Sequence, residues 1–294
     1  MLASKPDDRS LRYDVARAQY NLAEALIPAG DLRGAEQTVD RDIAIKRALL
    51  ALDSANAVWR TTLVNSLTTR ATALAMLGHA DSALVALTEA ASILEQLSKS
   101  DSTNRDSRRS RAINAVRRTD AQLSRAELAA LRSLLAPATQ ALEELVAADT
   151  ARLELRQDLA YARRMNSALE MRSGSLEKAR DLAASAGALL PDSAPVRTPR
   201  LMLLHGASAR LMEGTALSRL GNVKEAMVRW KEAERLTAPL VAAGNDPGAL
   251  AIAVESRVRQ ERRKEATELL TRLRKTGFRE AGFMQRLREL GMQY

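Results

Sequence analysis

Cysteine is absent from the 294 residues, which excludes disulfide bonds, thiolate metal ligands and a cysteine nucleophile. Histidine occurs only at His79 and His205, so no histidine pair has the spacing of a metal site. Glycine-rich phosphate-binding loops, the nucleophile-elbow motif and the protein-kinase motifs are missing as well. We therefore expect a protein that is not an enzyme and that holds no cofactor and no metal.

Long apolar segments are also missing from the sequence. The first eight residues have no apolar signal core, and no run approaches the ~18 residues needed to cross a bilayer. We therefore expect no membrane insertion. A cytoplasmic location is our expectation, with a periplasmic fragment as the alternative, and the sequence leaves the oligomeric state open.

Aromatic residues make up 3% of the chain, whereas hydrophobic residues make up 46%. The apolar residues are mostly alanine and leucine, and 37 of the 45 basic residues are arginine. These residues are strong helix formers, and period-two runs of β-branched or aromatic residues do not occur. The composition predicts an all-α fold with enough apolar residues for a sizeable core.

The net charge of +9 is concentrated in two segments. Residues 103–132 and residues 250–294 each carry an excess of five positive charges. Basic patches of this kind favour nucleic acid as a possible partner. Because residues 103–132 contain no Phe, Trp or Tyr for base stacking, we rank nucleic acid second to a protein partner.

A sequence pattern repeats with a period of 48 residues. A leucine is followed four positions later by an aspartate and a hydroxyl residue, and the aspartates are Asp53, Asp101 and Asp149. Glycines keep the same period at Gly30, Gly78, Gly174 and, one residue short, Gly221. Repeats of this length are typical of helical solenoids. We predict a single array of six units with approximate bounds 5–52, 53–100, 101–148, 149–196, 197–244 and 245–294, and its start at a unit boundary suggests a piece of a larger array.

Each unit is predicted to contain two helices, A and B. Helix A ends at the glycine, which adopts the left-handed conformation without a Cβ penalty. An alanine five residues later, at Ala35, Ala83, Ala179 and Ala226, allows close contact between the two helices. The aspartate, serine or threonine of each mark is expected to cap the next helix A. Pro191, Pro195 and Pro199 predict the longest loop before the fifth unit, and we expect about twelve helices plus a short one near 280–290.

This arrangement resembles the tetratricopeptide repeat, whose unit has a turn glycine and small residues in both helices. The residues that carry the resemblance are Leu22-Ala23, Gly30 and Ala35 in the first unit, and Gly214, Gly221, Ala226 and Ala233 in the fifth. The unit is longer than in the family, and most of the family's Trp and Tyr positions differ. In this respect the chain resembles the long-period C-terminal arrays of bacterial signalling proteins, including serine/threonine kinases and transcriptional regulators. The resemblance implies an α-solenoid of antiparallel helix pairs wound into a right-handed superhelix.

The resemblance also implies a concave groove lined by helix A residues. Counted from the turn glycines, the expected protein-binding residues are Tyr20, Asn21, Asn65, Thr69, Met76, Arg117, Tyr161, Arg164, Met165, Arg172, Met212 and Arg219. The same count places Glu24, Thr68, Thr72 and Asp120 on this face. Arginines suit acidic segments and methionines suit adaptable apolar contacts, although ordinary helix packing with solvated arginines would use the same residues. We expect a non-catalytic scaffold that binds an acidic, partly apolar protein segment, as a regulatory part of a bacterial signalling system.

Four arginines share the 48-residue period, namely Arg12, Arg60, Arg108 and Arg156. A contact that recurs in every unit is more typical of repeat stacking than of ligand binding. We interpret these arginines as ion-pair partners of acids at the end of the preceding helix B. A row of guanidinium groups that binds a ligand is the alternative.

Overall fold

The computed structural model describes residues 8–100, 104–190 and 199–294. These residues form helices and turns, without a strand among them. The helices, in chain order, are α1 (Arg9–Ala29), α2 (Leu32–Leu52), α3 (Ala57–Met76), α4 (Ala80–Ser100), α5 (Arg105–Gln122), α6 (Leu128–Ala148), α7 (Leu153–Ser173), α8 (Leu176–Ala188), α9 (Arg200–Arg219), α10 (Val223–Ala243), α11 (Pro247–Arg259), α12 (Arg263–Lys275) and α13 (Ala281–Glu289).

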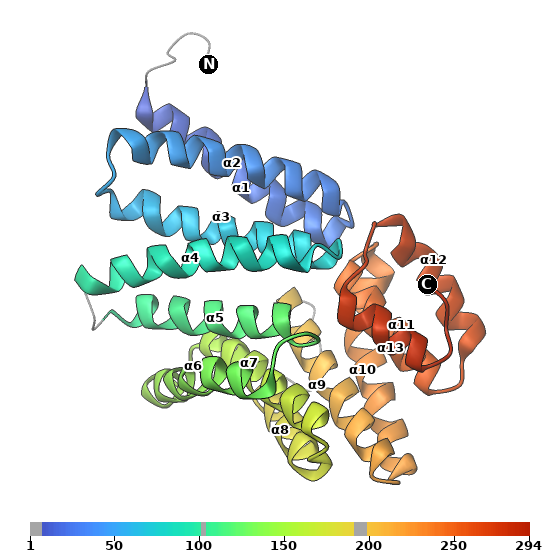
Figure 1. The fold of residues 1–294 in the computed structure, drawn as a ribbon. Helices are drawn as coiled ribbons and strands as arrows, with labels where there is room; N and C mark the ends of the chain where they lie inside the picture. Colours follow the sequence, from blue (N-terminus) through green and yellow to red (C-terminus); the bar gives the residue numbers. More distant parts are fainter. Residues whose placement is uncertain (1–7, 101–103, 191–198) are drawn as a thin grey trace.

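Consecutive helices pack as pairs, and each pair stacks on the next to form a solenoid (Figure 1). The predicted all-α solenoid is therefore confirmed, and α13 is the short helix expected near 280–290. The division into six units of 48 residues stays a prediction. The long loop expected at Pro191 and Pro195 falls outside the described residues, whereas Pro199 precedes the first turn of α9.

Glycine ends the first helix of four pairs, as predicted. Gly30, Gly78, Gly174 and Gly221 all have φ between 84° and 87°, the left-handed region. The α5–α6 connection has no glycine, and the carbonyl groups that follow the C-terminal end of α5 take another donor. Arg172 supplies it, because its guanidinium donates to the carbonyl oxygens of Leu123 and Ala126. The residue expected in the groove thus completes a turn of the neighbouring pair.

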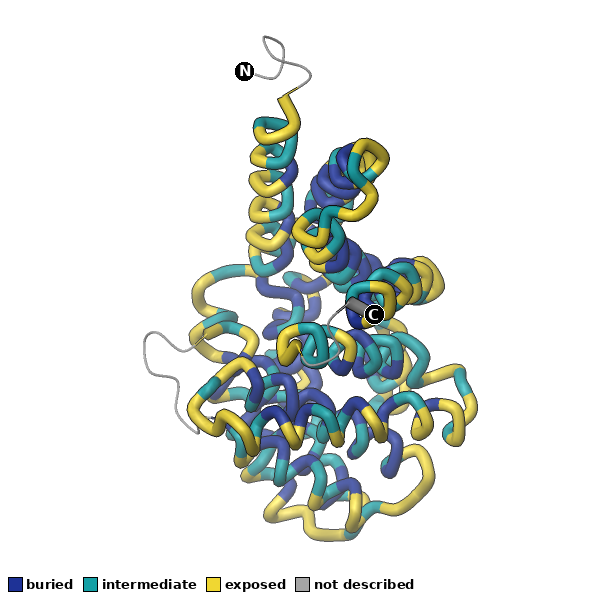
Figure 2. Tube along the Cα trace, turned by 90° about the vertical axis from the view of Figure 1, so that its left-hand side faces the viewer, coloured by how far each residue is buried: buried dark blue, intermediate teal, exposed yellow. Residues whose placement is uncertain are grey.

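Small residues bring the two helices of a pair together. The four repeat alanines, Ala35, Ala83, Ala179 and Ala226, are all fully buried, as predicted. In the α9–α10 pair, a Cβ placed on Gly214 would lie 2.6 Å from Trp230 Nε1, so only glycine fits there. Figure 2 shows that buried positions follow the sides on which neighbouring helices face each other.

Two of the repeated aspartates, Asp53 and Asp149, end helices instead of beginning them, which corrects the sequence prediction, whereas Asp101 lies outside the described residues. Asp53 and Asp149 are the C-terminal caps of α2 and α6. The N-terminal caps lie three residues later: Asn56 accepts from the Trp59 amide at 3.1 Å, and Asn104 accepts from the Ser107 amide at 2.9 Å. At the first mark, Asp53 and Asn56 therefore divide the two capping roles between them. After Asp149 the N-terminal cap is Arg152, which makes no side-chain capping bond.

The C-terminal helices α11–α13 contact the turns of the two N-terminal pairs, a contact that we call the closure (Figure 1). Ile27, Leu32 and Leu77 share one apolar cluster with Phe278 and Phe283. The Arg279 amide donates to the Met76 carbonyl at 2.6 Å. The solenoid therefore returns on itself, and its last helices cover the turns of its first.

A buried ion pair joins α2 to α3. Lys46 is 2% exposed, and its ammonium group donates to Asp42 at 3.0 Å, to Ser66 at 2.7 Å and to the Thr62 carbonyl at 3.2 Å. Burial lowers the pKa of Lys46 and raises the pKa of Asp42, while their mutual hydrogen bond opposes both shifts. All three ammonium hydrogens have acceptors, so the pair is a structural element of the α2–α3 contact.

Candidate functional site

Arginines connect helices of successive pairs. Arg125 pairs with Asp81 at 2.5 Å, and Arg109 pairs with Asp158 at 2.5 Å. Arg152 pairs with Asp106 at 3.0 Å, so residues about 45 positions apart are repeatedly joined. A guanidinium group has five donors in a planar fork, which suits it to bond a carboxylate on a neighbouring pair. These bonds give part of the large arginine content a structural role.

Two of the four periodic arginines, Arg108 and Arg156, behave differently from the prediction. Arg108 pairs with Glu144 at 2.6 Å, and Arg156 donates to the Leu189 carbonyl at 2.9 Å. Both acceptors belong to, or directly follow, the helix that comes after the arginine. The expected partner in the preceding helix B is therefore wrong for Arg108 and Arg156. Both side chains nevertheless bond within the scaffold, as the interpretation of these arginines as structural residues requires.

Polar side chains also connect the first helices of successive pairs. Thr69 on α3 donates to Glu24 on α1 at 2.6 Å, and Arg117 on α5 donates to Thr72 on α3 at 2.9 Å. These contacts join positions 45 residues apart in both cases. They place a carboxylate and a guanidinium group on neighbouring turns of the same face of α3.

The contacts between the first helices of successive pairs continue at an aromatic cluster on α7 and α9. Tyr161 donates to Asp120 at 2.5 Å, its ring stacks on His205 with centroids 4.9 Å apart, and Arg164 lies 4.8 Å from the ring centroid. Burial is the main cause that lowers the pKa of His205 well below its usual value, and Arg164 and Arg117 lower it further. Burial also raises the pKa of Tyr161, with a contribution from Asp120. His205 is therefore neutral at pH 7, and Tyr161 keeps its proton and donates a hydrogen bond to Asp120.

A cavity of about 290 Å³ opens between α1, α3 and α5. Its lining residues are Tyr20, Glu24, Val64, Asn65, Thr68, Thr69, Thr72, Arg109, Ser110, Ile113, Asn114 and Arg117. Hydroxyl, amide and charged groups dominate this lining. We call it the α1–α3–α5 cavity and take it as the candidate functional site, because polar groups from three helices converge there.

The charges in the cavity differ in what they already bind. Arg109 is occupied by Asp158. Arg117 forms no ion pair with any described residue, and its Nε is buried without a hydrogen-bond partner. Glu24 likewise lacks a cationic partner within the described ranges, although it accepts from Thr69. Burial raises the pKa of the Tyr20 hydroxyl, Glu24 raises it further, and Arg117 opposes the shift. The cavity therefore holds a guanidinium group and a carboxylate that can still accept a ligand.

Four of the predicted groove residues line this cavity, namely Tyr20, Asn65, Thr69 and Arg117. Tyr161 and Arg164 belong to the adjacent aromatic cluster. Asn21 and Arg219 are exposed on α1 and α9, outside the cavity lining.

Met165, Met76, Met212 and Arg172 depart from the expected exposed groove. Met165 is 1% exposed and belongs to the core of α5, α6 and α7, so it cannot serve as an accessible anchor. Met212 packs against the same core, and Met76 packs against the closure. Arg172 binds turn carbonyls. The helices α7 and α9 are enclosed by neighbours, and positions counted from a turn glycine do not detect such enclosure.

Sequence reasoning missed the α5 wall of the cavity. Arg109, Ser110 and Asn114 line it beside Arg117. Arg109, Ile113 and Arg117 follow each other at four-residue intervals, so they share one face of α5. That spacing was the available signal, and the highly charged composition of α5 concealed it.

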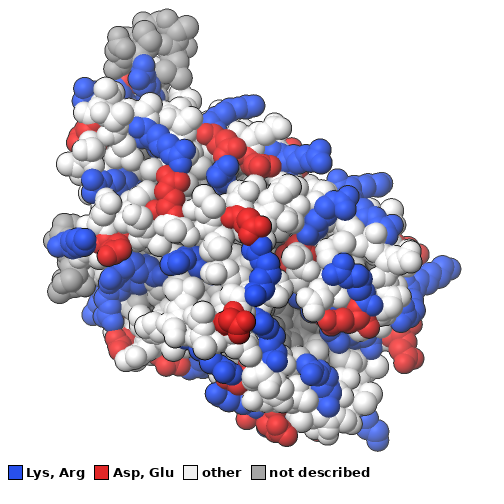
Figure 3. Space-filling model, in the orientation of Figure 1, with Lys and Arg blue, Asp and Glu red and all other residues white. Residues whose placement is uncertain are grey.

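Many arginines of the two basic segments form ion pairs with acidic residues of the same protein. In 103–132, Arg108, Arg109, Arg125 and Arg132 pair with acids outside the segment. In 250–294, Arg257 and Arg262 pair with Glu234, and Arg259 and Arg286 pair with Glu255. Figure 3 shows acidic and basic side chains interspersed on one face of the molecule. The excess charge of the sequence therefore does not form a continuous basic surface on that face.

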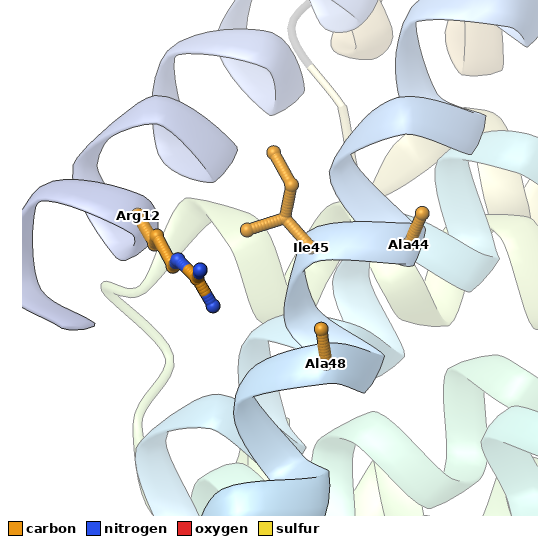
Figure 4. A pocket seen from close by; sticks show the side chains of 4 residues that line it. All are labelled: Arg12, Ala44, Ile45 and Ala48. Atoms are coloured by element: carbon orange, nitrogen blue, oxygen red, sulfur yellow. The ribbon is translucent and has the colours of Figure 1, made fainter. Parts of the chain in front are cut away.

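A second hollow of about 320 Å³ lies between α1 and α2 (Figure 4). Its lining is Arg12, Ala44, Ile45 and Ala48. This lining is aliphatic apart from one guanidinium group, so it offers few groups for specific recognition.

The described residues contain neither a group of three or more histidine or acidic side chains arranged to hold a metal ion nor a helix long and apolar enough to span a membrane. These findings concern the helices and turns listed above.

No protein-family profile matches the sequence, and no curated protein matches it. Among solved structures, BtubC (BKLC) from P. vanneervenii has a TM-score of 0.47 and 12% identity, over 83% of this chain and 90% of that one. Yeast Tom70 has a TM-score of 0.37 and 12% identity, over 88% and 59%. A tetratricopeptide repeat protein from Parabacteroides merdae has a TM-score of 0.30 and 13% identity, over 95% and 99%. The chain is similar to these proteins at a level too low to carry an argument, so the fold rests on its own helices.

Proposed function

We propose that this chain is a non-catalytic scaffold that binds an acidic segment of a protein partner in the α1–α3–α5 cavity. The observation that supports the proposal is Arg117, an inward-facing arginine of the cavity without a carboxylate partner among the described residues. A carboxylate of the partner would receive charge-assisted hydrogen bonds from this guanidinium group. The cytoplasmic location and the link to bacterial signalling stay predictions.

The groove proposed here is smaller than the sequence implied. Met165 is excluded as an anchor because it is buried in the core. Arg164 remains a neighbour of the cavity, with its Nε buried and without a hydrogen bond. Binding therefore depends on polar contacts made by α1, α3 and α5 more than on methionine side chains.

The test compares two arginines that carry the same charge in different places. Arg117→Ala removes the cavity arginine that forms no ion pair with a described residue, whereas Arg125→Ala removes one that pairs with Asp81 outside the cavity. We expect Arg117→Ala to weaken binding of a fluorescent octaglutamate peptide about tenfold and Arg125→Ala to have little effect, as measured by anisotropy. Equal losses in both variants would contradict the proposal.

Nucleic acid is tested in the same assay with a single-stranded oligonucleotide. Binding through phosphate contacts would fall steeply as salt increases, and each lost arginine would reduce the salt dependence by a similar amount. Tight oligonucleotide binding that depends equally on Arg117 and Arg125 would favour the alternative. Circular dichroism of each variant confirms that the fold is retained.

A further inference from the structure

We infer that the α1–α3–α5 cavity recognises a bipolar peptide segment, in which an acidic side chain and a lysine or arginine lie close together. This inference rests on the proposed function and specifies the chemistry of the partner. It comes from two opposite charges in the cavity, Glu24 and Arg117, that are not bonded to each other or to any other described charge.

The geometry of α3 fixes how far apart these charges lie. Glu24 accepts from Thr69, and Arg117 donates to Thr72. Residues three positions apart on a helix are neighbours on one face, with Cβ atoms about 5–6 Å apart. The carboxylate and the guanidinium group are therefore held about one helical turn apart by two threonine hydroxyls.

Each of the two charged groups has hydrogen-bonding positions that no described residue uses. A carboxylate accepts about four hydrogen bonds, and Glu24 receives one from the described residues. A guanidinium group has five donors, and Arg117 uses one of them on Thr72, while its Nε has no partner. Glu24 is exposed and Arg117 is half-buried, so a ligand with one charge would form an ion pair with only one of these groups. A ligand with both charges satisfies both.

The remaining lining limits the size and the contacts of the segment. Arg109 does not compete for the ligand carboxylate because Asp158 already binds it. Asn65, Thr68 and Ser110 supply neutral donors and acceptors around the charges. The volume of about 290 Å³ admits a few side chains, not a folded element. The cavity therefore fits a short extended segment whose neighbouring side chains have opposite charges.

The experiment is a selection from a random dodecapeptide display library on the wild-type chain. We expect the selected peptides to be enriched in an acid with a lysine or arginine within three positions. On Glu24→Gln, the enrichment of the basic residue should disappear while that of the acidic residue remains. On Arg117→Gln, the acidic preference should disappear. Synthetic peptides from the wild-type selection should bind each variant about tenfold more weakly.

Asp81→Asn and Arg125→Gln are the matched controls, because they remove the same charges from an ion pair outside the cavity. Both should select the same peptides as the wild type. Acidic peptides without a basic residue, lost on Arg117→Gln, would overturn this inference and leave the proposed function standing. Selection of neither charge would overturn both. Should Arg117→Gln fold poorly, Arg117→Lys retains the charge and should retain the acidic preference.

Discussion

The burial of Lys46 shows how this scaffold uses a charged residue inside the core. The lysine and Asp42 are both shielded from solvent, and Ser66 donates to the same carboxylate. Removing one partner of such a pair leaves an isolated charge in a low-dielectric environment, which costs much more than removing both. We interpret the pair as a device that fixes how α3 aligns on α2.

Lys46→Met should therefore destabilise the fold by about 3–5 kcal/mol, because it leaves the Asp42 carboxylate without its cation. The double variant Asp42→Leu with Lys46→Met should lose less, since Ser66 keeps its hydrogen bond to the Thr62 carbonyl at 2.9 Å. Urea denaturation followed by circular dichroism measures both. A double variant less stable than the single one would contradict the role assigned to the pair.

The pH dependence of Lys46→Met follows from the raised pKa of Asp42. In the folded variant, Asp42 takes up a proton at a pH at which the same aspartate in the unfolded chain, with its usual pKa near 3.9, is still ionised. Protonation in this window favours the folded state, so stability falls as the pH rises through it. We expect the variant to have a lower free energy of unfolding than the wild type. This difference should be largest at pH 7 and should shrink as the pH falls towards 4. A deficit independent of pH would mean that Asp42 finds another cation.

At the scale of elements, the four turn glycines are equivalent in backbone conformation but not in surroundings. A Cβ on Gly78 would lie 2.7 Å from the Arg279 carbonyl oxygen, and one on Gly30 would lie 2.7 Å from that of Asn245. A Cβ on Gly174 or Gly221 would meet nothing within 4 Å. The first two glycines therefore serve both the turn and the closure.

Gly174→Ala should cost about 1–2 kcal/mol, the penalty of the left-handed conformation for an alanine. Gly78→Ala carries the same penalty and also displaces the Arg279 backbone, so we expect a further ~1–3 kcal/mol. Hydrogen exchange at the Arg279 amide should accelerate in Gly78→Ala and stay unchanged in Gly174→Ala. Equal free energies of unfolding for the two variants, measured in urea, would show that the closure adjusts to the added Cβ without a loss of stability.

The sequence predicted the features that depend on local chemistry. Gly30 and Ala35 identify a turn and a close helix contact, because each property belongs to one residue in one conformation. Part of the site followed as well, since Tyr20, Asn65, Thr69 and Arg117 lie on the cavity-facing sides of their helices. Met165 was misassigned because α7 is buried on most sides, and helical periodicity identifies a face without showing how many neighbours cover it.

The closure itself had no counterpart in the sequence. Leu77 and Phe278 are apolar residues at helix ends, and nothing near either one indicates that they share a cluster. Contacts between distant segments arise from the curvature that small stacking angles accumulate over the whole array. That curvature depends on every intervening contact, including the arginine bridges, so a repeat period does not determine it.

At the scale of the molecule, the closure should make unfolding more cooperative than in an open array. Open repeat proteins contact only their neighbours and can unfold in parts. The chain has two tryptophans, Trp59 on α3 and Trp230 on α10, which report on opposite portions of the solenoid. We expect single-tryptophan variants of the closed protein to show one shared urea midpoint by fluorescence.

Leu77→Ala should separate these midpoints, because Leu77 joins α3 to the C-terminal helices. Leu142→Ala is the control, since it also truncates a buried leucine, in the α5–α7 core and away from the closure. Each substitution should lower the free energy of unfolding by about 2–5 kcal/mol. Only Leu77→Ala should yield different midpoints at Trp59 and Trp230, and a shared midpoint there would show that the closure does not couple the ends.

The hydrogen bond from Arg279 to Met76 also has a kinetic consequence. Its two residues are 203 positions apart, whereas the arginine and threonine bridges between successive pairs join residues fewer than 50 positions apart. The entropy of bringing chain ends together increases with loop length, and distant contacts slow folding. Neighbouring pairs can therefore form early from nearby contacts, and the last pair docks after the array between residues 76 and 279 has acquired its shape. A nascent chain emerging from the ribosome would hold its first turns without their cover until synthesis reaches the final helices.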